Sequence, residues 1–161
     1  MQLKNKVIYL YLALFVIAVD QASKMLVRHL IPYMFWRDII PDCLRLWHVR
    51  NSGAVWGLLD GHGMAVTTTI TVLALAALLF VLFVFLKTEP QNRLELTSLA
   101  FVLGGALGNI IDRLRHGFVT DFFDVYVGNR HFPTFNVADS FITVGVLLLA
   151  LSLWRGKCTR S

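Results

Sequence analysis

The sequence predicts an all-α membrane protein with four transmembrane helices and a small β-containing surface subdomain between the first two. Hydrophobic residues make up 57% of the 161 positions and charged residues only 16%, which excludes an ordinary soluble domain. Mean hydropathy is +0.65. Four long apolar runs are separated by polar stretches, and the first linker is rich in aromatic and turn-forming residues. This length and pattern favour one integral-membrane domain over residues 1–161.

The net charge and the cysteines exclude several classes of partner and site. The formal charge is +5, but the basic residues form no stripe with interleaved aromatics, so nucleic acid is not an expected partner. Attraction to anionic lipid head groups explains the charge better. Cys43 and Cys158 are the two cysteines, and they lie far apart outside any CxxC spacing. Neither a disulfide framework nor a cysteine metal site is expected.

The first predicted span covers about residues 7–25. Lys4 and Lys6 followed by an apolar run also fit a secretory signal peptide. Asp20 and Gln21, however, stand where small residues should precede a cleavage site, and further spans follow. Asp20 and Lys24 are four residues apart, so they share a helix face and can form an ion pair.

Residues 26–63 contain no second span and predict a small sheet resting on the membrane surface. The stretch 44–50 alternates like a strand, and residues 51–53, Asn-Ser-Gly, predict a turn. Aromatic side chains at this density are typical of the lipid–water boundary. They are Tyr33, Phe35, Trp36, Trp47 and Trp56.

Three more spans are predicted at about residues 64–86, 96–111 and 137–154. The first of these contains no charged residue. The second contains Gly104 and Gly108 in GxxxG spacing, which predicts close approach by neighbouring helices.

This layout puts both termini on one side of the membrane and the linkers 26–63 and 112–136 on the other. The terminal side carries seven of the 15 lysines and arginines. The other eight are spread over a much longer stretch, among eight aspartates. The density of basic residues therefore predicts cytoplasmic termini.

Polar residues at helical spacing predict a wet pocket beside the two long linkers. Asn109, Asp112, Arg113 and His116 share one face, and Asn136, Asp139, Ser140 and Thr143 repeat that spacing. Asp139 is the only ionisable side chain between residues 132 and 154. A carboxylate near a membrane helix centre costs about 2.5–3.5 kcal/mol, so a partner or a reaction is expected there. The alternative is that Asp139 only caps its helix.

Two carboxylates in a partly apolar pocket can share a proton, so that one activates water while the other donates to a substrate carbonyl. The residues alone leave open whether Asp121 or Asp124 pairs with Asp139. They also leave two rival functions open. One is a metal-dependent membrane lipid transferase using Asp121 and Asp124, and the other is a small proton-linked transport protein using Asp139 and Asn109.

Five motifs in this order resemble the lipoprotein signal peptidase (signal peptidase II) family. They are Asp20-Gln21 with Lys24, Asn51-x-Gly53-Ala54, Asn109-x-x-Asp112-Arg113, Val119-x-Asp121-Phe122, and Phe135-Asn136-x-Ala138-Asp139-Ser140. Together they span residues 20–140. The resemblance departs at Val55-Trp56, where the family more often has a small residue followed by Phe.

The resemblance implies an aspartic endopeptidase of the bacterial inner membrane, without metal or cofactor, whose catalytic pair is Asp121 and Asp139. It implies diacylglyceryl-modified prolipoproteins as substrates, cut before the lipidated cysteine at the periplasmic boundary. Globomycin is the implied inhibitor, membrane lipid an expected contact, and a monomer the expected state.

The resemblance also carries roles to individual residues. Those implied to bind substrate or the oxyanion are Asn51, Gly53, Asn109, Asp112, Arg113, Asn136 and Ala138. Asp112 is further expected to orient Arg113. Asp20 and Lys24 are expected to support the site. Trp36, Trp47 and Trp56 either grip the substrate or anchor the protein in the interface.

Overall fold

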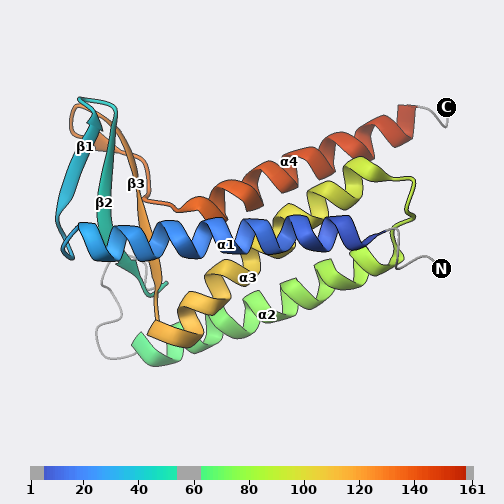
Figure 1. Ribbon diagram of the computed structural model, residues 1–161, viewed down its shortest axis with the longest axis horizontal. Helices are drawn as coiled ribbons and strands as arrows, with labels where there is room; N and C mark the ends of the chain where they lie inside the picture. The colour runs from blue at the N-terminus through green and yellow to red at the C-terminus, as the bar shows by residue number, and fades with distance from the viewer. Residues whose placement is uncertain (1–5, 54–62, 159–161) are drawn as a thin grey trace.

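The computed structural model describes residues 6–53 and 63–158, and four long helices dominate this part of the chain (Figure 1). They are α1 (Val7–Leu30), α2 (Gly63–Lys87), α3 (Arg93–His116) and α4 (Val137–Cys158). By length and composition each is able to cross a membrane, as the sequence predicted. The predictions for Ala54, Val55 and Trp56 concern positions outside the described residues.

Two helices are longer at their polar ends than the apolar runs that predicted them. α1 continues past residue 25 to Leu30, and α3 continues past residue 111 to His116. Their last turns carry basic residues, Arg28 and His29 in α1 and Arg113, Arg115 and His116 in α3. Positive charge stabilises a helix C-terminus, so both helices extend beyond the apolar region that hydropathy detects.

A four-stranded antiparallel sheet lies at one end of the helices, in the order β1-β2-β3-β4 (Figure 1). The linker between α1 and α2 supplies β1 (Trp36–Ile40) and β2 (Leu44–Asn51), which confirms the predicted surface sheet. The linker between α3 and α4 supplies β3 (Val119–Val127) and β4 (Arg130–His131), for which the sequence predicted no strand. β3 is buried on both faces over most of its length, so it lacks the alternation that reveals a half-exposed strand.

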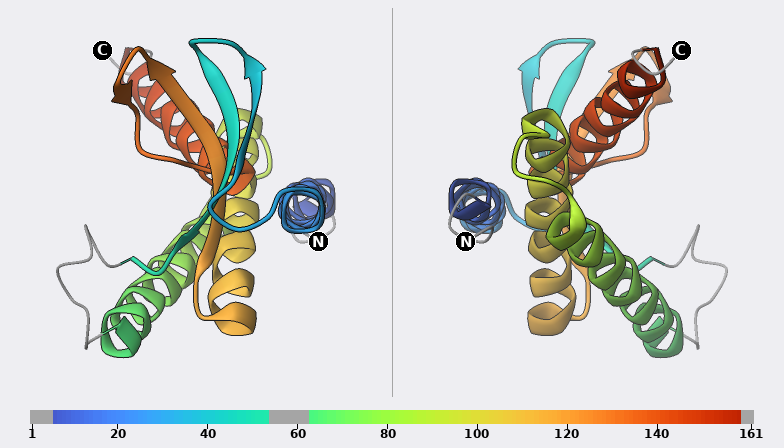
Figure 2. Two further views of the ribbon diagram at one scale, coloured as in Figure 1. Left: turned by 90° about the vertical axis from the view of Figure 1, so that its left-hand side faces the viewer. Right: turned by 90° about the vertical axis from the view of Figure 1, so that its right-hand side faces the viewer.

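α3 lies at the centre of the bundle, with α1, α2 and α4 arranged around it (Figure 2). Its glycines allow close contact. A Cβ built on Gly104 would lie 2.7 Å from the Ala13 carbonyl oxygen, and one on Gly108 would lie 2.5 Å from Asp20 Oδ2. On another face, a Cβ on Gly105 would lie 2.5 Å from the Ala138 carbonyl oxygen. The packing predicted from the GxxxG spacing is therefore confirmed.

The two ends of the bundle differ in the side chains that they bury. α1 begins and α4 ends at the side opposite the sheet (Figure 1). The apolar core consists of Ala13, Phe85, Leu96, Leu99, Ala100 and Leu103. Close to the sheet many buried side chains are polar or charged, beside apolar ones such as Val119 and Phe122. The polar and charged ones include Asp20, Lys24, Asn109, Asp112, Thr120, Asp121 and Asn136. Buried charged groups are stable only when they pair with one another, and the residues paired in this way form the candidate site.

Candidate active site

Asn136 connects the two carboxylates of the predicted pair. Its Nδ2 donates to Asp121 Oδ1 over 2.6 Å, and its backbone N–H donates to Asp139 Oδ2 over 3.2 Å. Asp139 N–H returns a hydrogen bond to Asn136 Oδ1 over 3.0 Å. This reciprocal pattern is a capping box at the start of α4. Asp139 thus caps its helix, as the alternative interpretation held, but only one of its oxygens is used for the cap.

The second oxygen of Asp139 faces α3. Asn109 Nδ2 donates to Asp139 Oδ1 over 2.8 Å, and Asn109 Oδ1 accepts from Asn136 Nδ2 over 3.2 Å. Asp121, Asn136, Asp139 and Asn109 therefore form one hydrogen-bonded cluster built from β3, α3 and the beginning of α4 (Figure 1).

A bulge in β2 separates Asp121 from Asp124. Leu46 pairs with Phe123 and Val49 with Asp121, so three steps along β2 match two along β3. β3 is also irregular, because the N–H groups of Phe122 and Phe123 both donate to the Phe135 carbonyl oxygen. The contacts of the two carboxylates therefore decide which way each one faces. Asp124 accordingly lies away from the cluster and binds Arg45 Nε at 2.6 Å.

Because of this bulge, β2 side chains that would otherwise share one face of the sheet point to opposite faces on its two sides. Without it, Arg45 and Asn51, six positions apart, would share a face. With it, Arg45 contacts Asp124 on one side of the sheet, while Asn51 Nδ2 donates to Asp121 Oδ2 over 2.9 Å on the other. His131 also contacts Asp124, at 3.0 Å. A metal held jointly by Asp121 and Asp124 does not fit this arrangement, because their carboxylates point apart.

Gly53 shapes the site through its backbone. Its N–H donates to Asn51 Oδ1 over 2.8 Å, which closes the predicted turn and aims the Asn51 amide hydrogens at Asp121. Gly53 has φ +78°, and a Cβ there would overlap Ile70 Cδ1. The backbone conformation favours glycine at this position, and any Cβ would also force the Ile70 methyl group to move.

A buried ion-pair network lies behind the cluster. Lys24 Nζ lies 2.9 Å from Asp20 Oδ2 and 3.5 Å from Asp112 Oδ2, which confirms the predicted pairing of Asp20 with Lys24. Asp20 Oδ1 accepts from Ala138 N–H over 3.0 Å and so binds the first turn of α4. Ala138 is fully buried, so its place in the structure is in helix packing and not on a substrate-contacting surface.

Sequence reasoning missed two members of this network, Arg28 and Thr120. Arg28 Nη1 donates to Thr120 Oγ1 over 2.9 Å and lies 3.4 Å from Asp112 Oδ1, while Thr120 N–H donates to Asp112 Oδ2 over 3.0 Å. Arg28 is four residues after Lys24 on α1, so its helical spacing could have revealed it. Thr120 carried no comparable signal.

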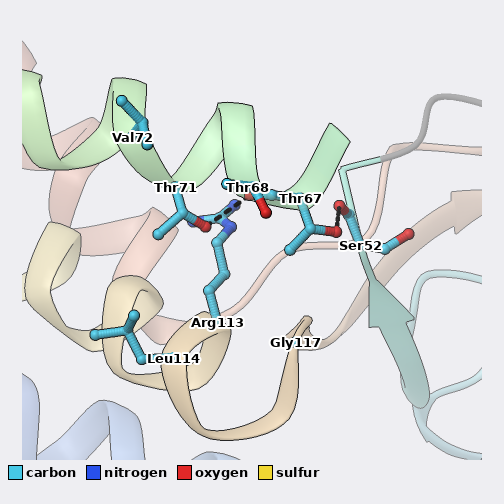
Figure 3. A pocket seen from close by; sticks show the side chains of 8 residues that line it. All are labelled: Ser52, Thr67, Thr68, Thr71, Val72, Arg113, Leu114 and Gly117. Atoms are coloured by element: carbon cyan, nitrogen blue, oxygen red, sulfur yellow. Dashed lines mark hydrogen bonds between the residues drawn. The ribbon is translucent and has the colours of Figure 1, made fainter. Parts of the chain in front are cut away.

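The hydrogen bonds that the structure gives Asp112 come from Arg28 and from Thr120 N–H and not from Arg113, which corrects the expectation that Asp112 orients Arg113 through hydrogen bonds. Adjacent residues on a helix point about 100° apart. Asp112 therefore faces α1, while Arg113 reaches toward Thr67, Thr68 and Thr71 of α2 (Figure 3).

There Arg113 lines a pocket of about 510 Å³ between α2 and α3, with Ser52 at its edge. The Arg113 Nε atom is buried and has no hydrogen-bond partner. Its charge interacts favourably with Asp139 and Asp121, and to a smaller extent with Asp112. Of the residues implied to bind substrate, Arg113 thus combines an open pocket with an unused donor.

Burial, helped by the nearby Asp139 charge, raises the pKa of Asp121 to about 6, against the lowering effects of hydrogen bonds from Asn51 and Asn136 and of the Lys24 charge. Asp121 is 1% exposed. A carboxyl group with this pKa holds a proton for part of the time near neutrality, as a general acid requires. The assignment of Asp121 and Asp139 as catalytic stays a prediction.

Comparison with known proteins gives consistent matches. The family model described as "Signal peptidase (SPase) II" matches residues 12–155. The lipoprotein signal peptidase of Serratia proteamaculans (strain 568) is 40% identical over 153 residues, covering 95% of this chain and 90% of that protein. The protein of the same name from Syntrophotalea carbinolica is 39% identical over 155 residues and covers 96% of each chain.

A solved structure titled "Bacterial membrane enzyme structure by the in meso method at 1.9 A resolution" superposes with a TM-score of 0.79 and 33% sequence identity. The match covers 90% of this chain and 91% of that one.

Proposed function

This chain belongs to the signal peptidase II family and removes signal peptides from prolipoproteins, and we propose that it does so as an aspartic endopeptidase through Asp121 and Asp139. It is a multi-pass membrane protein, in keeping with its four apolar helices and its likeness to a membrane enzyme. The observation that carries the proposed mechanism is the bridge that Asn136 makes between Asp121 and Asp139.

In this mechanism the pair carries one proton and needs no metal or other cofactor. Asp139 accepts a proton from water as the water oxygen bonds to the scissile carbonyl carbon, while Asp121 donates its proton to the carbonyl oxygen. The resulting tetrahedral intermediate collapses as the C–N bond breaks: Asp139 gives its proton to the leaving amine, and Asp121 takes a proton back from the hydroxyl group that becomes the new carboxyl carbonyl. The raised pKa of Asp121 supports its role as the resting proton carrier.

The asparagines divide between orientation and substrate binding. Asn136 has both amide hydrogens engaged, with Asp121 and Asn109, so it orients the pair. Asn51 and Asn109 each use one amide hydrogen on a catalytic carboxylate and keep one for substrate. Arg113, with its unpaired Nε, would hold the substrate backbone or the developing oxyanion.

The site's expected surroundings follow from the substrate. A diacylglyceryl cysteine sits at head-group depth, so we propose cleavage just before it at the periplasmic boundary of the bacterial inner membrane, with both termini cytoplasmic. Exposed Trp36, beside the guanidinium of Arg45 at 4.9 Å, suits contact with membrane lipid or with the signal peptide. Globomycin would bind in the site formed by Asp121 and Asp139. One copy of the chain would be sufficient for activity.

Cleavage of a purified lipidated precursor tests this proposal. Asp121→Asn and Asp139→Asn should each lower kcat by about 10²–10⁴-fold, the usual contribution of a general acid or base. Asp124→Asn, on the other face of β3, is the matched control and should cleave. If Asp124→Asn stops cleavage while Asp121→Asn does not, the pair is misassigned. Loss of activity in EDTA would favour metal chemistry instead, and globomycin should inhibit.

A further inference from the structure

Lys24 makes a contact that its ion pairs do not require. The side chain is fully buried, and its ammonium already lies within 4 Å of the Asp20 and Asp112 carboxylates. It also donates to Asn109 Oδ1 over 2.8 Å. Asn109 is the residue whose Nδ2 donates to Asp139. A cation on α1 is therefore one side chain away from a proposed catalytic carboxylate on α4.

The chemistry of the ammonium determines which way the Asn109 amide faces. An ammonium has three donors and no acceptor, so only the oxygen of a neighbouring amide can face it. The NH₂ group of Asn109 must then point the other way, toward Asp139 Oδ1. Asn136 Nδ2 strengthens this orientation by donating to the same Asn109 oxygen.

We propose that Lys24 is a positioning residue for proteolysis, whose ammonium fixes the Asn109 amide so that an N–H group always faces Asp139. This inference rests on the proposed roles of Asp121 and Asp139. Lys24 touches neither substrate nor reacting atoms and acts through Asn109.

As a consequence, the Asn109 orientation that Lys24 fixes favours Asp139 as a carboxylate, the form in which it acts as the base. An amide hydrogen stabilises a carboxylate, whereas an amide oxygen stabilises only a protonated carboxyl group. Without Lys24 the Asn109 amide is free to turn its oxygen toward Asp139, and the doubly protonated pair, which has no free base, would persist to higher pH. The charged and titratable groups around this path are Asp20 and Arg28 from α1, Asp112, Arg113 and His116 from α3, and Asp121 from β3.

The test must separate this role from simple charge balance. Lys24→Met alone would leave buried Asp20 without its cation, so the variant of choice is Asp20→Asn/Lys24→Met, which removes both ends of the pair. Asn at position 20 can still accept from Ala138 N–H, and Asp112 keeps Arg28. The matched control is Arg45→Gln/Asp124→Asn, which removes another largely buried pair, on the far face of β3.

We expect the double variant at positions 20 and 24 to fold, to lower kcat at pH 6 about tenfold with little change in KM, and to move the acidic limb of the kcat profile up by about one pH unit. Asn109→Asp keeps Lys24 and its ion pairs but presents an oxygen to Asp139, so it should move the limb in the same direction. The control variant Arg45→Gln/Asp124→Asn should lower the melting temperature and leave the acidic limb of the kcat profile unchanged.

An unmoved acidic limb in the variant at positions 20 and 24 overturns the proposal, and so does a loss confined to melting temperature or KM. If this variant does not fold, Lys24 belongs to folding and the proposal is abandoned. The pH dependence of the melting temperature gives a second readout, because it follows the proton on the pair without needing cleavage. Should the wild type fail to cleave, the proposed function fails, while this readout still reports on Lys24.

Discussion

The side-chain amide of Asn136 donates to Asp121 over 2.6 Å, while the side-chain oxygen of the same residue caps the N-terminus of α4. One asparagine thus joins a strand from one linker to the helix that carries the other carboxylate. The orientation of the proposed catalytic pair and the start of a membrane helix consequently depend on the same side chain.

Asn136→Asp separates these two tasks. Aspartate caps a helix about as well as asparagine, so α4 should persist. One carboxylate oxygen, however, replaces the Nδ2 group, whose two hydrogens are donated to Asp121 and Asn109. We expect kcat to fall by about 10²-fold or more, within the range of general acid–base catalysis. Asn92→Asp, at the exposed start of α3, is the matched control, and equal activity of the two variants would contradict the orienting role.

Asp121→Asn should change how stability depends on pH. The pKa of Asp121 is raised in the folded state from 3.8 to about 6, so folding favours its neutral form. That stabilisation is complete below the unfolded pKa of 3.8 and is lost as pH rises through about 6. The full change corresponds to about 3 kcal/mol.

Melting temperatures in detergent at pH 4 and pH 8 provide the measurement. The wild type should lose stability relative to Asp121→Asn as the pH rises, while exposed Asp42→Asn should follow the wild type at both values. Parallel curves for wild type and Asp121→Asn would show that Asp121 is not perturbed.

Gly53→Ala should reduce activity more than an ordinary glycine substitution. Its Cβ would overlap Ile70, and the strained turn would release Asn51 from Asp121. We expect about tenfold slower cleavage with a destabilisation of about 1–3 kcal/mol. Gly128→Ala also sits at positive φ but with nothing within 4 Å, so it should cost stability alone. Comparable cleavage by both variants would remove Gly53 from the site.

Arg113→Gln tests the pocket between α2 and α3. Loss of the guanidinium removes a buried donor and the positive charge beside the pair, so kcat/KM should fall about tenfold or more, equivalent to about 1.4 kcal/mol. Arg115→Gln, two positions along α3 and exposed, should cleave normally. Equal effects of the two substitutions on a lipidated substrate would indicate a general charge effect instead of binding in this pocket.

Local patterns in the sequence were sufficient to predict the four helices and the polar residues buried near the sheet. Apolar runs of membrane length predict α1 to α4, and the spacing of Gly104 and Gly108 predicts close packing. The four-residue spacing of Asp20 and Lys24 predicts their ion pair. Each of these signals depends on residues within one or two helical turns, so each can be read without knowing the fold.

The choice between Asp121 and Asp124 needed the tertiary structure. Both residues lie in one strand that is buried on both faces, so the sequence carries no alternation to say which face meets α4. A one-residue bulge in β2 sends Asn51 and Arg45 to opposite sides and so gives the two aspartates different partners. The reach of Lys24 to Asn109, 85 residues away, likewise exists only once α1 packs against α3. Long-range pairing and register are properties of packed elements, and local sequence patterns do not encode them.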